Sequence, residues 1–156
     1  MLSSQPILHD MTDVLFYHLE RATPAQVLPG LLERTLARNW TAVIRCAGER
    51  QVKDLDEHLW TYHEESFLPH GTGAPEPETP VWLTASYELP SGRDVLFALT
   101  AEGFQPDSLA GLTRAVLMFT DDQAPDARMV WKAVKASNLE STYWKQDPSG
   151  KWIKAA

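Results

Sequence analysis

The chain has 156 residues, of which 44% are hydrophobic and 22% charged, and its formal net charge is −7. This length suits one domain with a hydrophobic core, and the composition excludes a disordered or low-complexity protein. The negative charge opposes a general nucleic-acid binder, and no apolar run reaches the roughly 18–20 residues of a membrane span. The one cysteine excludes an internal disulfide, so we expect a cytoplasmic protein.

The first part of the chain alternates predicted strands and helices. Residues 11–20, "MTDVLFYHLE", are almost continuously apolar or aromatic, as in a strand covered on both faces. Thr23 and Pro24 then predict the start of a helix, as its N-cap and first helical residue. "TAVIRC" at residues 41–46 predicts a second buried strand, and a helix is expected over residues 48–59. This alternation is typical of a parallel sheet with crossover helices.

The second part predicts further strands and a closing hairpin. Residues 71–80, "GTGAPEPETP", predict a loop because of their glycines and prolines. Short apolar runs predict strands over residues 81–84, 94–99 and 114–119. A helix is expected to begin at Asp121-Asp122 and to end near Asn138. Two alternating segments around residues 147–150 predict a hairpin, and the fold class is therefore α/β.

The first strand-to-helix turn lacks the sequence of a nucleotide site. This turn reads "ERATPAQ" and has no glycine, and neither GxGxxG nor GxxxxGK[ST] occurs in the sequence. A nucleotide-dependent enzyme is therefore a disfavoured hypothesis. His58 and His63 are five residues apart with no neighbouring cysteine, which opposes a zinc site. Asp121-Asp122 more simply complement a helix N-terminus, so we expect neither a metal nor another cofactor.

Charge is unevenly distributed along the chain. Residues 127–156 contain six basic and two acidic residues, whereas the first 126 contain eight basic and nineteen acidic residues. Within the basic end, Arg128, Lys132 and Lys135 have the spacing of one helix face, with Trp131 on its shoulder. This face suits an acidic peptide with an aromatic anchor, or single-stranded nucleic acid. Solvated basic residues beside a core tryptophan are the simpler alternative. The residues expected to face the core are Met129, Val130, Ala133 and Val134.

Four stretches resemble the chi subunit family of bacterial DNA polymerase III. They are "VLFYHL", "LDEHLWTYHEESFLPHG", "ARMVWKAVKA" and "TYWKQDPSGKWIKA". The resemblance runs from about Met11 to Ala156 and implies a single α/β domain over residues 11–156. It implies a three-layer α/β/α arrangement that is Rossmann-like but lacks a phosphate-binding loop. Family members begin at the methionine matching Met11, so we expect residues 1–10 to be a poorly ordered extension.

The resemblance implies a non-catalytic accessory subunit of the DNA polymerase III holoenzyme. Such a subunit is a monomer by itself, contributes to a nucleotidyltransferase complex, and joins the clamp-loader assembly to single-stranded-DNA-binding protein. It does so by binding the acidic C-terminal tail of that protein, and it contacts nucleic acid mainly indirectly. The alternative function is a direct single-stranded-DNA-binding module. That module would use the lysines of the C-terminal region with Trp131, Tyr143, Trp144 and Trp152.

The resemblance also implies two sets of site residues. The tail site matches Arg128, Trp131 and Lys132, and helical spacing adds Lys135. Some family members have a basic residue near the position of Ala124, where this chain has none. Other members have tyrosine at the position of Trp131. Either Met118 or Phe119 is expected near Trp131 in the fold. The second set faces the psi subunit of the clamp loader or an alternative helicase. Its anchors are Trp60, Phe67, Leu68 and Pro69.

Overall fold

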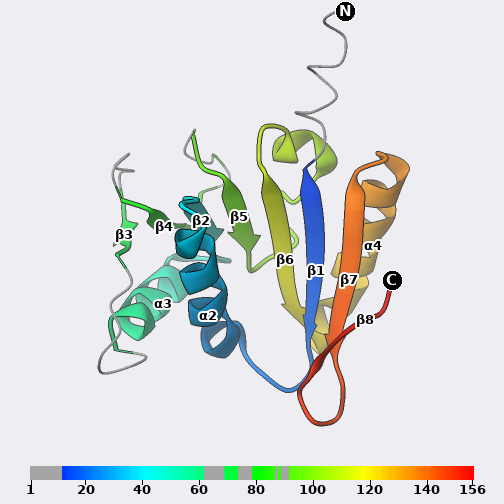
Figure 1. The fold of residues 1–156 in the computed structure, drawn as a ribbon, viewed down its shortest axis with the longest axis horizontal. Coiled ribbons are helices and arrows are strands. Elements are labelled where there is room, and N and C mark those ends of the chain that lie inside the picture. Colours follow the sequence, from blue (N-terminus) through cyan, green and yellow to red (C-terminus); the bar gives the residue numbers. More distant parts are fainter. Residues whose placement is uncertain (1–11, 62–68, 74–78, 87, 89–91) are drawn as a thin grey trace, which may run out of the picture.

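A computed structural model describes residues 12–61, 69–73, 79–86, 88 and 92–156 (Figure 1). The expected extension, residues 1–10, and the two anchors Phe67 and Leu68 lie outside these ranges. Within them, no helix has the length and apolar character needed to cross a membrane. The strands are β1 (Asp13–Leu19), β2 (Ala42–Arg45), β3 (Gly71–Thr72), β4 (Val81–Thr84), β5 (Val95–Ala98), β6 (Arg114–Thr120), β7 (Glu140–Gln146) and β8 (Trp152–Lys154). The helices are α2 (Pro24–Ala37), α3 (Glu49–Thr61) and α4 (Ala124–Ala136), with the 3₁₀ turns η1 (Pro106–Leu109) and η2 (Asp121–Gln123).

The strands form one mostly parallel sheet, as predicted. Their order is β3-β4-β2-β5-β6-β1-β7-β8, which places the first strand near the C-terminal end of the chain in space. β1 pairs in parallel with β6 on one side and with β7 on the other, so that Phe16 lies between Leu117 and Tyr143. In the described part of the chain, β7 and β8 are the one antiparallel pair, which confirms the predicted hairpin.

Helices cover both faces of this sheet, which confirms the three-layer α/β/α arrangement. α2 and α3 lie on one face and α4 on the other (Figure 1). Side chains of β1 alternate between the two faces, because successive residues of a strand point in opposite directions. Leu15 and Leu19 pack under α2 and α3, whereas Val14 and Phe16 pack under α4. Full burial of a side chain such as Phe16 contributes about 1.5–3 kcal/mol of hydrophobic free energy.

The N-terminus of α2 is capped by the side chains of its own first residues. Oγ1 of Thr23 accepts a hydrogen bond from the Gln26 amide at 3.3 Å, and Oε1 of Gln26 accepts one from the Thr23 amide at 2.9 Å. This capping box, with Pro24 in the first turn, confirms the helix start predicted from the sequence. It occupies two of the backbone donors that a phosphate would need at this first turn of an α/β sheet.

Three details differ from the sequence-based expectation. Gly71–Thr72, predicted as loop, forms the short edge strand β3 beside Trp82 and Leu83 of β4. This pairing is made by backbone groups, so no alternation of apolar and polar side chains in the sequence predicts it. η1 was not predicted either. β7 was expected as a hairpin arm, yet it also pairs with β1, a contact between residues about 127 positions apart that no local pattern encodes.

We predict that Gly71→Ala destabilises the protein by about 1–3 kcal/mol, the usual cost of overpacking. A Cβ at this position would lie 2.5 Å from Cζ3 of Trp82, a buried ring whose Nε1 also donates to the Gly73 carbonyl at 3.1 Å. Urea unfolding followed by circular dichroism measures the change in free energy. Gly48→Ala is the matched control, because an added Cβ there has no neighbour within 4 Å. Equal decreases of the unfolding free energy in both variants would contradict this account.

We also predict that Cys46 is unreactive in the folded protein. It lies buried at the end of β2, and burial, reinforced by the Glu49 carboxylate, raises the pKa of its thiol to about 12. The thiolate, which is the reactive form, is therefore nearly absent at pH 8. A colorimetric disulfide reagent should react at pH 8 only after urea unfolds the chain. Rapid reaction of the native protein would refute the assignment of Cys46 to the core.

Candidate functional site

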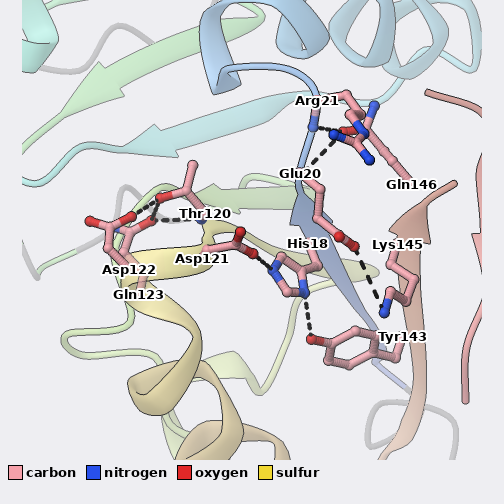
Figure 2. Close-up of polar contacts among 10 residues, drawn as sticks. All are labelled: His18, Glu20, Arg21, Thr120, Asp121, Asp122, Gln123, Tyr143, Lys145 and Gln146. Carbon is pink, nitrogen blue, oxygen red and sulfur yellow. Dashed lines mark hydrogen bonds and ion pairs between the residues drawn. The ribbon is translucent and has the colours of Figure 1, made fainter. Parts of the chain in front are cut away.

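The start of α4 is fixed at the carboxyl end of β6. The Thr120 amide donates to Oε1 of Gln123 at 3.0 Å, and the Thr120 hydroxyl donates to Asp122 (Figure 2). These contacts shape η2, and Pro125 lies in the first turn of α4, where a missing N–H costs nothing. The carboxylates of η2 therefore belong to a helix start, as the sequence suggested, and α4 begins at a defined place beside β1.

The core-facing side of α4 differs in part from the expectation. Ala124, Ala127 and Val134 are buried, Val130 is half-buried, and Met129 is 72% exposed. Met129 was expected in the core, and this expectation is wrong, as it is for the exposed Ala133. A helix turns by about 100° per residue, so Met129 lies about 200° around the axis from Ala127 and faces away from the sheet. Hydrophobicity alone did not reveal which apolar residues define the inner face.

Trp131 lies at the edge of this inner face. Its ring meets Phe16 edge-on at 5.0 Å between centroids and 81°, and Tyr143 at 5.6 Å and 86°. Such perpendicular aromatic contacts each contribute about 0.5–1.5 kcal/mol beyond area burial. Nζ of Lys135 lies 4.7 Å from the centroid of the Trp131 ring, a cation–π contact. Trp131 is therefore half in the core and half at the surface, which combines the two alternatives that the sequence left open.

The basic residues form one exposed stripe beside Trp131. Arg128, Lys132 and Lys135 are exposed, and among the residues that the structure describes none of them forms an ion pair with a carboxylate. Burial raises the pKa of Tyr143, and the positive charge of Arg128 acts in the opposite direction. We call Arg128, Trp131, Lys132, Lys135 and Tyr143 the α4 surface. All four α4 residues predicted from the sequence lie together on it.

A polar network behind the α4 surface was not predicted (Figure 2). Nε2 of His18 lies 2.6 Å from Oδ1 of Asp121, and Nδ1 lies 3.0 Å from the Tyr143 hydroxyl. A carboxylate only accepts, so Nε2 donates to Asp121, and Nδ1 of the neutral ring accepts from Tyr143. The ring also stacks on Phe119 at 4.8 Å. The available signal was His18 itself, a polar residue inside an otherwise apolar strand.

Two further contacts join the ends of β1 and β7 next to this network. Oε1 of Gln146 accepts hydrogen bonds from the backbone amides of Glu20 and Arg21, at 3.1 and 2.8 Å. Nζ of Lys145 lies 3.8 Å from the Glu20 carboxylate (Figure 2). These contacts hold β7, and therefore Tyr143, in register with β1. The orientation of the phenol depends on them as well as on His18.

Of the two residues expected near Trp131, only one lies on the correct face. Phe119 packs with the α4 side of the sheet, and its ring centroid lies 5.9 Å from that of Tyr143. Met118 packs on the opposite face, under α2 and α3, so of the two alternatives only Phe119 remains. The reason is the alternation of neighbouring residues along β6. Ala124 is buried at the start of α4 and contributes no charge.

Of the second predicted set, the structure describes Trp60, in the last turn of α3, and Pro69. Trp60 is 47% exposed, and its ring centroid lies 4.4 Å from that of His70. Nε2 of His70 lies 2.9 Å from Oδ1 of Asp56, which fixes this histidine under the indole. Pro69 is half-buried, while Leu59 is fully buried in the core. α3 and α4 cover opposite faces of the sheet, so Trp60 and the α4 surface do not form one site (Figure 1).

Comparisons with known proteins show the family of this chain. The model of the family described as "DNA polymerase III chi subunit, HolC" matches residues 11–142, which include Trp60 and the four α4 residues. The chain is 35% identical to "DNA polymerase III subunit chi" of Pseudomonas aeruginosa over 102 residues, covering 62% of this chain and 72% of the relative. It is 25% identical over 154 residues to "Probable DNA polymerase III subunit chi" of Rickettsia prowazekii, covering 94% and 93%. It is 29% identical over 149 residues to "DNA polymerase III subunit chi" of Escherichia coli, covering 86% and 100%. The chain therefore belongs to the chi subunit family of DNA polymerase III, whose members are accessory rather than catalytic components of that polymerase.

Proposed function

We propose that this protein joins the clamp-loader assembly of the replicative polymerase to single-stranded-DNA-binding protein, in the cytoplasm. In this proposal the α4 surface binds the acidic C-terminal tail of that binding protein. The observation that supports it best is the stripe of Arg128, Lys132 and Lys135, which is exposed beside aromatic rings and has no carboxylate partner in the described part of the chain. Such a stripe on a protein with a net charge of −7 favours a local acidic ligand.

Each residue of the α4 surface has a distinct proposed role. Arg128 pairs with a tail carboxylate through two parallel hydrogen bonds, which its planar guanidinium allows. Lys132 adds a point charge for the other acidic residues of the tail. Trp131 and Tyr143 form the apolar wall for the terminal phenylalanine, and Lys135 is held above the indole, where it extends the positive field.

Tail binding is favoured over the alternative of direct single-stranded-DNA binding. Bases stack on aromatic faces that are open to solvent. Trp131 and Tyr143 are half-buried and meet each other edge-on, and the Trp152 ring packs on Tyr17 at 5.1 Å. Rings packed in this way do not offer the successive open faces that a run of bases requires, although the half-exposed Trp131 and Tyr143 can contact one apolar side chain. A bare oligonucleotide is the direct test of the alternative.

The second set of residues that the resemblance implies is proposed as a second partner surface. Trp60, Phe67, Leu68 and Pro69 would bind the psi subunit of the clamp loader or an alternative helicase. This part of the proposal is supported by the exposed indole of Trp60, because tryptophan is enriched at the energetic centres of interfaces. His70 and Asp56 hold the ring in one orientation, which lowers the entropy lost on binding.

We predict that a labelled acidic peptide ending in Asp-Ile-Pro-Phe binds with roughly micromolar affinity, which weakens as salt is added. Arg128→Ala and Lys132→Ala should each weaken binding about tenfold, as expected when a charged hydrogen-bonding partner of about 1.5 kcal/mol is lost. Fluorescence anisotropy measures the affinity. Lys53→Ala is the matched control, because Lys53 is an exposed cation on α3, across the sheet.

Three results would contradict the tail proposal. They are the absence of binding at low salt, equal losses in all three variants, and binding of a bare oligonucleotide that is as tight as that of the peptide. Trp131→Ala is less informative, because removal of this ring also removes its contact with Phe16. Any Trp131 variant therefore needs a thermal unfolding curve beside its binding curve.

A second prediction concerns the carboxylate of Asp121, which is 78% exposed next to the network that holds Tyr143. Its negative charge repels an acidic tail, so Asp121→Asn should tighten peptide binding about twofold at low salt. A repulsion of about 0.4 kcal/mol between charges roughly 10 Å apart in water gives this factor. The gain should disappear at high salt. Weaker binding at low salt, with unchanged thermal stability, would contradict repulsion between Asp121 and a tail bound at the α4 surface.

A further inference from the structure

A second basic and aromatic feature lies on the other face of the sheet. A cavity of about 170 Å³ opens between the last turns of α2 and the strands β1, β5 and β6. Arg34, Arg38 and Arg114 line it together with the aromatic rings of Tyr17 and Trp40. Apolar side chains of the sheet, such as Val116, form its floor. It lies on the α2 side of the sheet, apart from the α4 surface.

Trp40 holds two of the guanidinium groups in place. Cζ of Arg38 lies 5.0 Å from the centroid of the Trp40 ring, and Cζ of Arg114 lies 5.5 Å from it. Two cations that share one indole are oriented before any ligand arrives, which reduces the ordering entropy that binding would cost. Arg38 comes from the end of α2 and Arg114 from the start of β6, so residues far apart in the sequence converge on this cavity.

The cavity contains more positive charge than its surroundings neutralise. Nε of Arg114 lies 3.4 Å from Oδ2 of Asp13, whereas Arg34 and Arg38 form no ion pair with any carboxylate in the described ranges. Nε of Arg114 is also buried, and its contact with Asp13 lacks the geometry of a hydrogen bond. Burial raises the pKa of Tyr17, and both Arg114 and Arg34 act against this rise, so their charges reach the same phenol.

Helix electrostatics explain only part of this convergence. Cations near the carboxyl end of α2 interact favourably with its dipole, which accounts for Arg34 and Arg38. Arg114 belongs to a strand and gains nothing from that dipole. Three like charges around one cavity repel one another, and an anion between them would remove this repulsion.

We propose that this cavity binds a small organic anion, in which a carboxylate or phosphate is attached to one apolar ring. A dry cavity of about 150 Å³ is large enough for benzene, so a volume of about 170 Å³ suits one ring. The ring would lie on the apolar floor, and the anionic group would meet the guanidiniums, whose planar donors match carboxylate and phosphate oxygens. A ring alone would lack contacts with the guanidiniums, and an anionic group alone would leave the apolar floor uncovered.

The test is a titration of the full chain with phenyl phosphate, followed by two-dimensional ¹H–¹⁵N NMR. The expected result is a saturable shift of the Trp40 indole N–H signal. Inorganic phosphate and benzyl alcohol, which each carry one half of the probe, should bind at least tenfold more weakly. A parallel titration with 3-phenylpropionate distinguishes a carboxylate ligand from a phosphate ligand, and saturable binding of either anion at Trp40 supports the proposal.

Variants locate the anion and keep this test separate from the tail proposal. Arg34→Gln and Arg38→Gln should each weaken binding about fivefold or more, with thermal unfolding curves confirming that both variants fold. Arg50→Gln, an exposed arginine of α3 that does not line the cavity, is the matched control and should leave the affinity unchanged. Arg128→Gln is made beside it to detect binding at the α4 surface instead. The proposal is overturned if neither anion shifts Trp40, if both α2 variants bind as tightly as the native chain, or if Arg128→Gln alone abolishes binding.

Discussion

Burial of β1 on both faces of the sheet is the constraint on which the rest of the structure depends. This strand pairs with β6 on one side and β7 on the other, and its side chains alternate between two helical layers. Phe16 points toward α4, where its ring contacts both Trp131 and Tyr143. Its neighbour Tyr17 points the other way and lines the cavity under α2. One strand therefore positions the aromatic groups of two separate surfaces.

The α4 surface shows how an acidic protein can present a local positive site. The cations of Arg128 and Lys132 lie on a helix side that the sheet does not cover, while Asp122 and Asp121, which precede the helix, contact Thr120 and His18. Because these acidic and basic groups lie apart, the basic charges remain available to a ligand. It also explains why net charge is a poor guide to partners, since the field near a binding surface depends on its nearest charges and on their screening.

Local sequence patterns predicted the elements better than they predicted the contacts between them. The apolar run of β1, the Thr23-Pro24 helix start and the C-terminal hairpin all follow from short-range chemistry, and the structure confirms them. The spacing of the basic residues along one face of α4 also followed from the sequence, and the structure adds that these residues are exposed. The prediction of which residues of the same helix face the core was partly wrong. The orientation of a helix depends on the sheet beneath it, and a hydrophobicity pattern does not specify that orientation.

The contacts that sequence analysis missed share a physical reason. His18, Asp121 and Tyr143 come from three different elements, and only the pairing of β1 with β6 and β7 brings them together. The same holds for Arg38 and Arg114 around Trp40. Arrangements of this kind depend on strand order, and strand order is set by the whole chain rather than by any segment of it.

The division of the core into two clusters has a consequence for mutational free energies. The cluster under α2 and α3 and the cluster under α4 are separated by the backbone of one hydrogen-bonded sheet. Substitutions at distant sites without shared partners usually add within about 0.3–0.5 kcal/mol. A change in the layer of Leu32 and a change in the layer of Val134 should therefore be energetically independent, whereas a pair such as Phe16 and Trp131 should couple strongly. A substitution in one layer should therefore change the unfolding free energy with little effect on the cost of a substitution in the other layer.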